Sequence, residues 1–408
     1  MEQIPIVGPM LSALGGESSA PGQGKRVIGY FTNWQTEHYP PHMVPVDELT
    51  HLNYSFAKVN EQTGEVTLSN PHTDTETHFR PQDETAQDAP PQQGHNLFGC
   101  LGAFFLMKKH NRNFKVMLSI GGATFSHAFK NMEYIHWRNT FVKSAVKLVE
   151  DVGLDGLDVD YEFPTNEQEA RYYAQLLGEL RTDLNNLADK LHQPRGQYLL
   201  SVAAPCGPDK MKLLHVKDMD KSLDFWNLMA YDFAGSWSKL SDHQANLQGK
   251  NASDISVDQA VKFYEKQGVH TNKLVIGIPL YGRTFEQTEG LNKPFHGSKT
   301  IDYKLLPVHG AQVHNDAHLG ASWSYDAHKK ELISYDNPEI ARQKTKYISQ
   351  NNLGGAMFWQ LEGDKPHKAH DSLVKIVREN IGKLEKRPNE LKYPYSKYDN
   401  LKGGSHMQ

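Results

Sequence analysis

The sequence predicts an α/β fold: a TIM (β/α)8 barrel with a small α+β subdomain inserted between its seventh and eighth strands. Eight short runs rich in β-branched or aromatic residues alternate with segments whose apolar residues recur at helical spacing. Several runs are almost entirely apolar at their centres, as expected for strands buried on both faces. A doubly wound open sheet is the alternative, but no glycine-rich phosphate loop follows the first run.

The expected elements alternate along the chain. The predicted strands are residues 26–34, 49–59, 114–122, 153–164, 198–205, 225–233, 273–285 and 355–361. The clearest helical patterns are residues 137–152, 167–191, 257–267, 341–350 and 371–381. Strand and helix in regular alternation indicate parallel βαβ units, and a barrel closes such units without edge strands.

The predicted barrel comprises residues 25–285 and 338–383. Residues 286–337 carry hairpin-like runs, so we expect them to form the inserted α+β subdomain and one wall of a groove; a surface decoration is the alternative. The polar stretch 60–96 is long for a loop and would lie on the functional rim. We expect residues 1–24 to form an N-terminal tail and residues 384–408 to form a C-terminal tail that ends in a cloning scar, GGSHMQ.

Composition excludes several classes of protein. A net charge of −4 over 408 residues offers no bulk positive charge for nucleic acid. No apolar run reaches the ~18 residues that a membrane span needs, and residues 1–24 lack the basic start of a signal peptide. The two cysteines, Cys100 and Cys206, are expected to be free thiols.

The stretch 153–164, GLDGLDVDYEFP, carries the strongest functional signal. Its acids alternate with apolar residues, which puts Asp158, Asp160 and Glu162 on one strand face at steps of ~6.5–7 Å. Asp155 has the opposite parity, so we expect it to be structural. Because adjacent carboxylates disfavour each other's ionisation, such a row indicates function rather than a solvated or structural row of acids. Glu162 lies nearest the barrel mouth, and a raised pKa there suits a general acid.

Aromatic and polar residues also fall late in the other predicted strands, where the active sites of such barrels lie. They are Tyr30, Trp34, Phe56, Ser119, Met229, Tyr231, Asp232, Tyr281, Arg283 and Trp359. Aromatic rings beside acids favour a neutral, polyhydroxylated ligand such as a sugar. No histidine has ligand spacing beside the acids, so we expect no metal and no other cofactor. Apart from Asp232, no strong second acid is found on an opposite strand, and that absence favours a glycosidase whose substrate supplies the nucleophile.

These motifs resemble the signatures of glycoside hydrolase family 18, the chitinases. The matching residues are Asp155, Asp158, Asp160 and Glu162; Ser119 with Gly121 and Gly122; Met229, Tyr231 and Asp232; Tyr281 and Arg283; and Trp359. The resemblance covers about residues 25–383 and is closest to fungal chitinases of the bacterial-like type.

The resemblance implies a retaining, substrate-assisted hydrolysis of β-1,4-linked N-acetylglucosamine polymers. Glu162 would protonate the glycosidic oxygen, and the 2-acetamido carbonyl of the sugar would attack its own C1 to give an oxazolinium ion. Asp160 would orient the acetamido N–H, Asp158 would share its proton, and Tyr231 would bond the acetamido oxygen.

The resemblance also implies a set of supporting contacts. Met229 and Trp359 would shape the pocket floor, Asp232 and Arg283 would bond sugar or acid, and Ser119 and Tyr30 would support Asp158, although Tyr30 and Phe56 could simply fill the barrel. Ala123 stands where many relatives carry tryptophan, a loss for which Trp34, Trp137 or Trp237 could compensate.

Two other functions are possible on the same scaffold. One is a catalytically inactive chitin lectin, which is disfavoured because Glu162 is present, and the other is an enzyme acting on N-glycan cores. The expected partner is chitin or a chitooligosaccharide, with no nucleic acid and no membrane. We expect a monomer that acts outside the cell, with the cytoplasm as the alternative.

Overall fold

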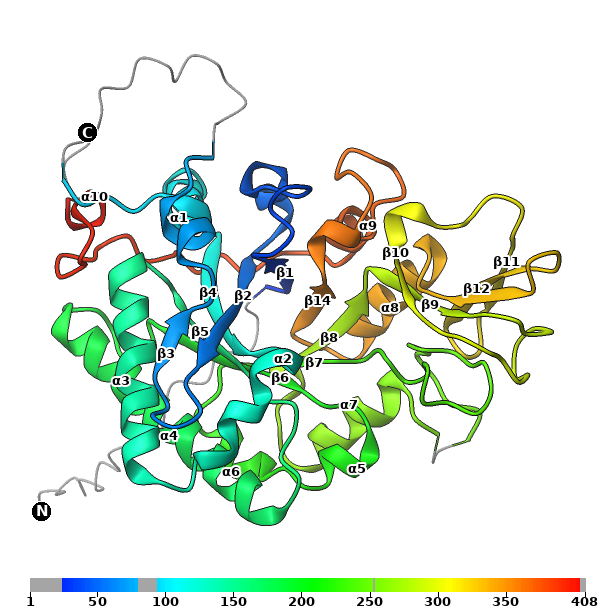
Figure 1. The fold of residues 1–408 in the computed structure, drawn as a ribbon, viewed down its shortest axis with the longest axis horizontal. Helices are drawn as coiled ribbons and strands as arrows, with labels where there is room; N and C mark the ends of the chain where they lie inside the picture. Colours follow the sequence, from blue (N-terminus) through cyan, green and yellow to red (C-terminus); the bar gives the residue numbers. More distant parts are fainter. Residues whose placement is uncertain (1–23, 80–93, 252–253, 404–408) are drawn as a thin grey trace, which may run out of the picture.

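Eight parallel strands form a closed barrel in the computed structural model, which describes residues 24–79, 94–251 and 254–403 (Figure 1). Around the barrel the order is β1, β14, β8, β7, β6, β5, β4 and β2, and β2 pairs with β1 to close it. The strands are β1 (Arg26–Thr32), β2 (His51–Val59), β4 (Lys115–Gly121), β5 (Gly156–Asp160), β6 (Leu199–Ala204), β7 (Phe225–Leu228), β8 (Leu274–Pro279) and β14 (Gly355–Trp359). The predicted barrel is confirmed.

Helices cover the outside of the barrel (Figure 1). They are α1 (Gly99–His110), α2 (Gly122–Phe125), α3 (Ile135–Val152), α4 (Glu167–Lys190), α5 (Pro208–Met211), α6 (Val216–Asp220), α7 (Val257–Lys266), α8 (Pro338–Gln350), α9 (Leu373–Asn380) and α10 (Asp399–Lys402). The sequence sets the ends of the two long helices that flank β5. Gly153 ends α3 in a left-handed conformation with φ of 72°, and the Asn166 side chain accepts a hydrogen bond from the Glu169 N–H (2.9 Å) to begin α4.

A second, antiparallel sheet of five strands is inserted between β8 and β14 and lies beside the barrel (Figure 1). Its order is β10 (Thr300–Asp302), β9 (Tyr281–Phe285), β13 (Glu331–Ser334), β12 (Ala321–Asp326) and β11 (Gln312–Asp316). The run 273–285, predicted as one strand, is therefore two strands in different sheets. The chain changes sheets at Leu280, whose N–H donates to the Trp359 carbonyl (2.8 Å) while its own carbonyl accepts from Tyr303 N–H (3.0 Å).

Two short elements of the polar stretch 60–96 pack against the rest of the fold. Strand β3 (Val66–Leu68) pairs antiparallel with β2, and a single wide helical turn, η3 (His72–Glu76), packs against α1. Residues 80–93 of this stretch lie outside the described residues, as do residues 1–23 of the predicted N-terminal tail and residues 404–408 of the predicted cloning scar.

Residues 384–403, expected as part of a tail, pack against the end of the barrel where the strands begin. Leu384 forms a β-bridge with Lys25, and the buried Asn389 side chain donates to the carbonyls of Lys108, Asn111 and Phe114 (2.7–3.1 Å). Asp155 completes this junction, because its carboxylate contacts the buried Lys108 ammonium at 2.9 Å and accepts from the Glu390 N–H. The structure thus gives Asp155 the structural role that its parity predicts.

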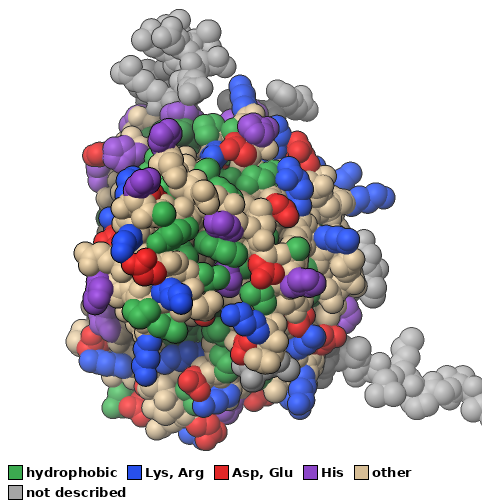
Figure 2. Space-filling view, turned by 90° about the vertical axis from the view of Figure 1, so that its right-hand side faces the viewer, with side chains coloured by type: hydrophobic (Ala, Val, Ile, Leu, Met, Phe, Trp, Pro, Cys, Tyr) green, Lys and Arg blue, Asp and Glu red, His purple; other side chains and the backbone are tan. Residues whose placement is uncertain are grey.

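The surface on the side of the inserted sheet mixes charges of both signs. Across the described part of this face, lysines and arginines alternate with acids and with histidines, and hydrophobic side chains occur in small groups (Figure 2). Among the described helices, none combines the length and the apolar character needed to cross a bilayer.

Candidate active site

Asp158 lies at the centre of the barrel and is fully buried. Its carboxylate accepts hydrogen bonds from four different strands, which are donated by Tyr30 Oη (2.6 Å), Ser119 Oγ (2.8 Å), Ser201 Oγ (2.7 Å) and Asn227 Nδ2 (3.2 Å). Strand register explains two of these contacts, because Ser119 and Ser201 are the direct neighbours of Asp158 on β4 and β6. Burial raises the pKa of Asp158, and the four hydrogen bonds oppose that rise.

Asp160 lies one pleat above Asp158, at the end of β5, and is only 3% exposed. Its Oδ1 has no hydrogen-bond partner among the described residues. Burial raises the pKa of Asp160 well above its ordinary value, and the charge of the neighbouring Glu162 carboxyl and a hydrogen bond with it raise this pKa further. A proton therefore resides on this pair of acids at a pH where isolated aspartate is ionised.

Glu162 follows the strand and is half-buried at the C-terminal end of the barrel. Its backbone N–H donates to Ser126 Oγ (2.8 Å), which ties it to the segment after β4. Burial raises the pKa of Glu162 and the negative charge of Asp232 adds to the rise, while the hydrogen bond with Asp160 opposes it. Of the three predicted acids, Glu162 is the one that a bound ligand can reach most easily.

The glycine pair after Ser119 lets neighbouring groups approach closely. Gly121 has φ of 110°, and a Cβ there would lie 2.2 Å from the Asp160 carbonyl oxygen. A Cβ on Gly122 would lie 2.6 Å from the Phe56 ring. Neither position can therefore carry a side chain without moving Asp160 or Phe56.

Three residues form a polar group beside Glu162. Asp232, in a left-handed conformation with φ of 58°, accepts from Tyr281 Oη (2.6 Å) and pairs with the Arg283 guanidinium (2.8 Å). Arg283 also lies over the ring of Trp237, 4.9 Å from its centroid, and Trp237 is 60% exposed.

Tyr231 lies between this group and the acids. Its pKa is raised well above its usual value by burial and by the charges of Asp160, Asp232 and Glu162, so the phenol keeps its proton and can donate it in a hydrogen bond. Met229, just past the end of β7, is half-buried.

Aromatic rings form a row on the other side of the site. Trp359, at the end of β14, contacts the Tyr30 ring edge-on at 5.4 Å and stacks on Phe56 at 5.6 Å. Phe56 stacks in turn on Trp34 at 6.0 Å, and Trp34 is 54% exposed. Tyr30 and Ser119 are at most 1% exposed, so they support Asp158 and do not themselves reach a ligand.

The structure contradicts one predicted contact. Trp137 lies in α3, is 2% exposed, stacks on Phe141 and donates its indole N–H to the Glu61 carbonyl (2.9 Å). Its position on the inward face of an outer helix makes it a core residue, so it provides no sugar platform and cannot compensate for Ala123.

Sequence reasoning missed three residues that hold the acids: Ser201, Asn227 and Ser126. Ser201 and Asn227 are single polar residues inside otherwise apolar predicted strands, LLSVAA and FWNL, and that interruption was the available signal. Ser126 gave no signal, because only the folded chain brings it under Glu162.

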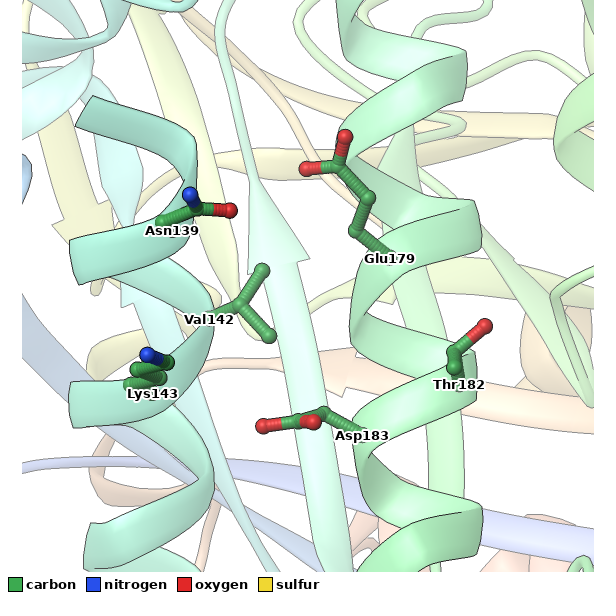
Figure 3. A pocket seen from close by; sticks show the side chains of 6 residues that line it. All are labelled: Asn139, Val142, Lys143, Glu179, Thr182 and Asp183. Carbon is green, nitrogen blue, oxygen red and sulfur yellow. The ribbon is translucent and has the colours of Figure 1, made fainter. Parts of the chain in front are cut away.

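A surface depression between α3 and α4 lies outside the barrel wall and is separate from Asp158, Asp160 and Glu162. It is lined by Asn139, Val142, Lys143, Glu179, Thr182 and Asp183 (Figure 3). Within the described ranges, no group of three or more His, Cys, Asp or Glu side chains is arranged to hold a metal ion.

Comparison with known proteins identifies the family. Residues 26–364 match the family model described as glycosyl hydrolases family 18. The chain belongs to glycoside hydrolase family 18. Two fungal relatives support the assignment: Chitinase 1 of Aphanocladium album is 40% identical over 97% of this chain and 94% of that protein, and Endochitinase 1 of Metarhizium robertsii is 40% identical over 91% and 89%.

Solved family 18 structures share the architecture of this chain. The catalytic domain of a psychrophilic chitinase B from Arthrobacter TAD20 superimposes with a TM-score of 0.79 at 25% identity and covers 90% of this chain and 98% of that one. A family 18 chitinase from Cycas revoluta in complex with (GlcNAc)3 gives a TM-score of 0.72 at 26% identity, with coverage of 88% and 100%. This family 18 hydrolase therefore has both the sequence signature and the barrel of its relatives.

Proposed function

We propose that this family 18 hydrolase is a chitinase, which cleaves β-1,4 bonds in N-acetylglucosamine polymers with retention and substrate assistance. The observation that carries the proposal is the stack of acids on β5. Asp158 is buried and fully hydrogen-bonded, Asp160 is buried with a free oxygen, and Glu162 is half-exposed with a raised pKa. The two named fungal relatives are both chitinases, which supports the same substrate class.

Glu162 acts as the general acid and then as the general base. Its raised pKa keeps a proton available for the glycosidic oxygen to higher pH than an isolated glutamic acid would, and transfer of that proton lets the oxygen leave as a neutral alcohol instead of an alkoxide. The glycosidic bond breaks as the 2-acetamido carbonyl oxygen bonds to C1, and the resulting oxazolinium ion carries the positive charge. A water molecule then attacks C1 and gives a proton to the Glu162 carboxylate, while the bond between C1 and the acetamido oxygen breaks; this regenerates the acetamido group and the protonated acid.

Asp160 and Tyr231 bind and orient the acetamido group. Asp160 Oδ1, which has no partner among the residues that the structure describes, can accept from the acetamido N–H, and the carboxylate stabilises the positive charge of the ring that forms. The protonated phenol of Tyr231 donates to the acetamido oxygen and sets its angle of attack. Asp158, held by four donors, keeps Asp160 in place, and no cofactor takes part.

The substrate lies between the aromatic row and the polar group. Trp359 and Trp34 stack on sugar rings on one side, with the buried Phe56 ring packed between them, and Asp232, Arg283 and Trp237 contact the sugars on the other. We propose that the enzyme acts as a monomer. Because chitin is deposited outside cells, we place the enzyme there; action in the cytoplasm is the alternative.

The test of substrate assistance compares acetylated with deacetylated substrates. We expect release of chitobiose from chitohexaose and no cleavage of fully deacetylated chitosan oligomers, because a free amine cannot form the oxazolinium ion. Product masses report the cleavage, and a change in rate with the degree of acetylation separates chemistry from binding. Turnover of fully deacetylated oligomers would exclude the mechanism, and an enzyme on N-glycan cores would release core oligosaccharides from glycoproteins faster than chitobiose from chitohexaose.

Asp232 should set the alkaline limb of the pH profile. The negative charge of Asp232 raises the pKa of Glu162, so activity that needs protonated Glu162 is kept to higher pH and is lost as pH rises through that pKa. Asp232→Asn removes the charge, and we expect the alkaline limb of kcat/KM to move to lower pH. The control is Asp218→Asn on α6, an exposed acid paired with Lys221, which should leave the limb in place. An unchanged alkaline limb of kcat/KM in Asp232→Asn would show that the charge of Asp232 does not affect the pKa of Glu162.

A further inference from the structure

The exposed ring of Trp34 is carried by a short segment that follows β1. Trp34 is 54% exposed, and within the described part of the chain its ring stacks on Phe56 alone. A side chain with so few neighbours would normally sample several rotamers, and ordering it when a sugar binds would reduce affinity. The two residues before it, Thr32 and Asn33, are in contrast almost fully buried, at 1% and 4% exposure.

Glu362 holds the first of these residues. Thr32 Oγ1 donates to Glu362 Oε1, and Glu362 is 4% exposed in the turn η8 (Leu361–Gly363), three residues after Trp359. The contact joins the end of β1 to the end of β14, the two strands that carry Trp34 and Trp359. Lys304 of the inserted subdomain donates to the Glu362 carbonyl (2.7 Å), so the same turn is also tied to the second sheet.

Asp74 holds the second residue. Asn33 Nδ2 donates to Asp74 Oδ1 (2.9 Å) and to Ser69 Oγ (2.9 Å). Asp74 is fully buried in η3, within the stretch 60–96, and also accepts from Tyr54 Oη and from the Asn70 N–H (3.0 Å). A segment far along the chain therefore reaches back to the residue beside Trp34.

These carboxyls are buried at a cost in free energy. Burial raises the pKa of Asp74, and burial raises the pKa of Glu362 to about 7. Glu362 Oε2 has no hydrogen-bond partner among the described residues. Burying a carboxyl that is not fully paired is unfavourable, and an apolar residue would fill the same space without that cost. The two carboxyl groups bind consecutive residues, Thr32 and Asn33, which directly precede an exposed ring. This arrangement indicates a role beyond packing.

We propose that Glu362 and Asp74 are positioning residues that clamp Thr32 and Asn33, and so hold the Trp34 ring in place for a sugar at the far end of a long substrate. This inference rests on the proposed function. Trp34 is the outermost ring of the row Trp359–Phe56–Trp34, so a chitohexaose extends to it and a chromogenic chitobioside does not.

The experiment compares kinetics on these two substrates. Trp34→Ala should raise KM for chitohexaose roughly 2- to 10-fold, the range expected for one aromatic stacking contact, and should raise KM for the chitobioside by much less. Thr32→Val, which removes the donor hydroxyl but keeps the side-chain shape, and Asp74→Ala should show the same split. Glu362→Gln keeps an acceptor for Thr32 and is the matched conservative variant, for which we expect wild-type behaviour.

A double-mutant cycle separates positioning from general stability. Thr32→Val added to Trp34→Ala should cause no further rise in KM for chitohexaose, because the ring that the clamp holds is already absent. Three results would overturn the inference. They are a double variant whose KM rises by the product of the two single effects, equal losses of activity on both substrates, and an unchanged KM in both Thr32→Val and Asp74→Ala. Failure of the wild-type enzyme to cleave either substrate would instead refute the proposed function. The chitobioside rate and a thermal melt report whether each variant is folded.

Discussion

Replacing Glu162 with glutamine should lower kcat on chitooligosaccharides by about 10²- to 10⁴-fold, the usual contribution of a positioned general acid–base. Glutamine keeps the size of the side chain and can still hydrogen-bond to Asp160, but it cannot deliver a proton to the glycosidic oxygen. Sugar binding should persist, because the ring row and the Asp232 group are untouched. Initial rates of chitobiose release give kcat, and calorimetric titration with chitohexaose gives the affinity.

The matched control for this variant is Glu167→Gln, which changes an exposed acid at the start of α4 in the same chemical way. It should retain full activity. Near-wild-type turnover by Glu162→Gln would assign the proton donor to another group. A wild-type chain that binds chitohexaose without cleaving it would favour the lectin over the enzyme.

Replacing Asp160 with alanine should lower kcat by about 10²- to 10³-fold, comparable to the loss of one group that stabilises a developing charge. The variant removes both the acceptor for the acetamido N–H and the negative charge beside the oxazolinium ion. Because these contacts strengthen as the ring closes, kcat should fall far more than KM rises. Steady-state rates over a range of chitohexaose concentrations separate the two parameters.

Asp160→Asn refines the test. Asparagine preserves shape but carries no negative charge, so we expect its kcat to lie near that of the alanine variant. Recovery of wild-type kcat by asparagine would mean that Asp160 acts through its shape and its acceptor oxygen, which asparagine retains, and not through its charge. Asp218→Ala, on the exposed part of α6, is the control and should have no effect.

Local geometry explains why the acid row could be predicted from the sequence. A strand places alternate residues on one face whatever surrounds it, so the spacing of Asp158, Asp160 and Glu162 determines that they share a face. The parallel barrel follows from equally local patterns, because strands buried on both faces must be covered by the helices between them. The parity of Asp155 placed it correctly outside the row for the same reason.

Trp137 shows where local patterns stop being informative. An aromatic residue near the rim suits a sugar platform and a core position equally well, and the rotation of α3 against the barrel decided in favour of the core. The run 273–285 has a nearly unbroken apolar stretch at residues 274–281, which spans β8 and the start of β9, so hydrophobicity alone did not reveal the change of sheet at Leu280.

The sequence by itself determined the family, the barrel and the face that carries the acids, since each follows from residue order and short-range geometry. Only the tertiary structure decided which side chains support them. Ser201 and Asn227 reach Asp158 from other strands of the barrel. Glu362 and Asp74 bind the two residues before Trp34, although they lie 330 and 41 positions from those residues in the sequence. Contacts over such separations depend on how the whole chain closes, because a residue's local sequence contains no information about a partner that only folding brings near.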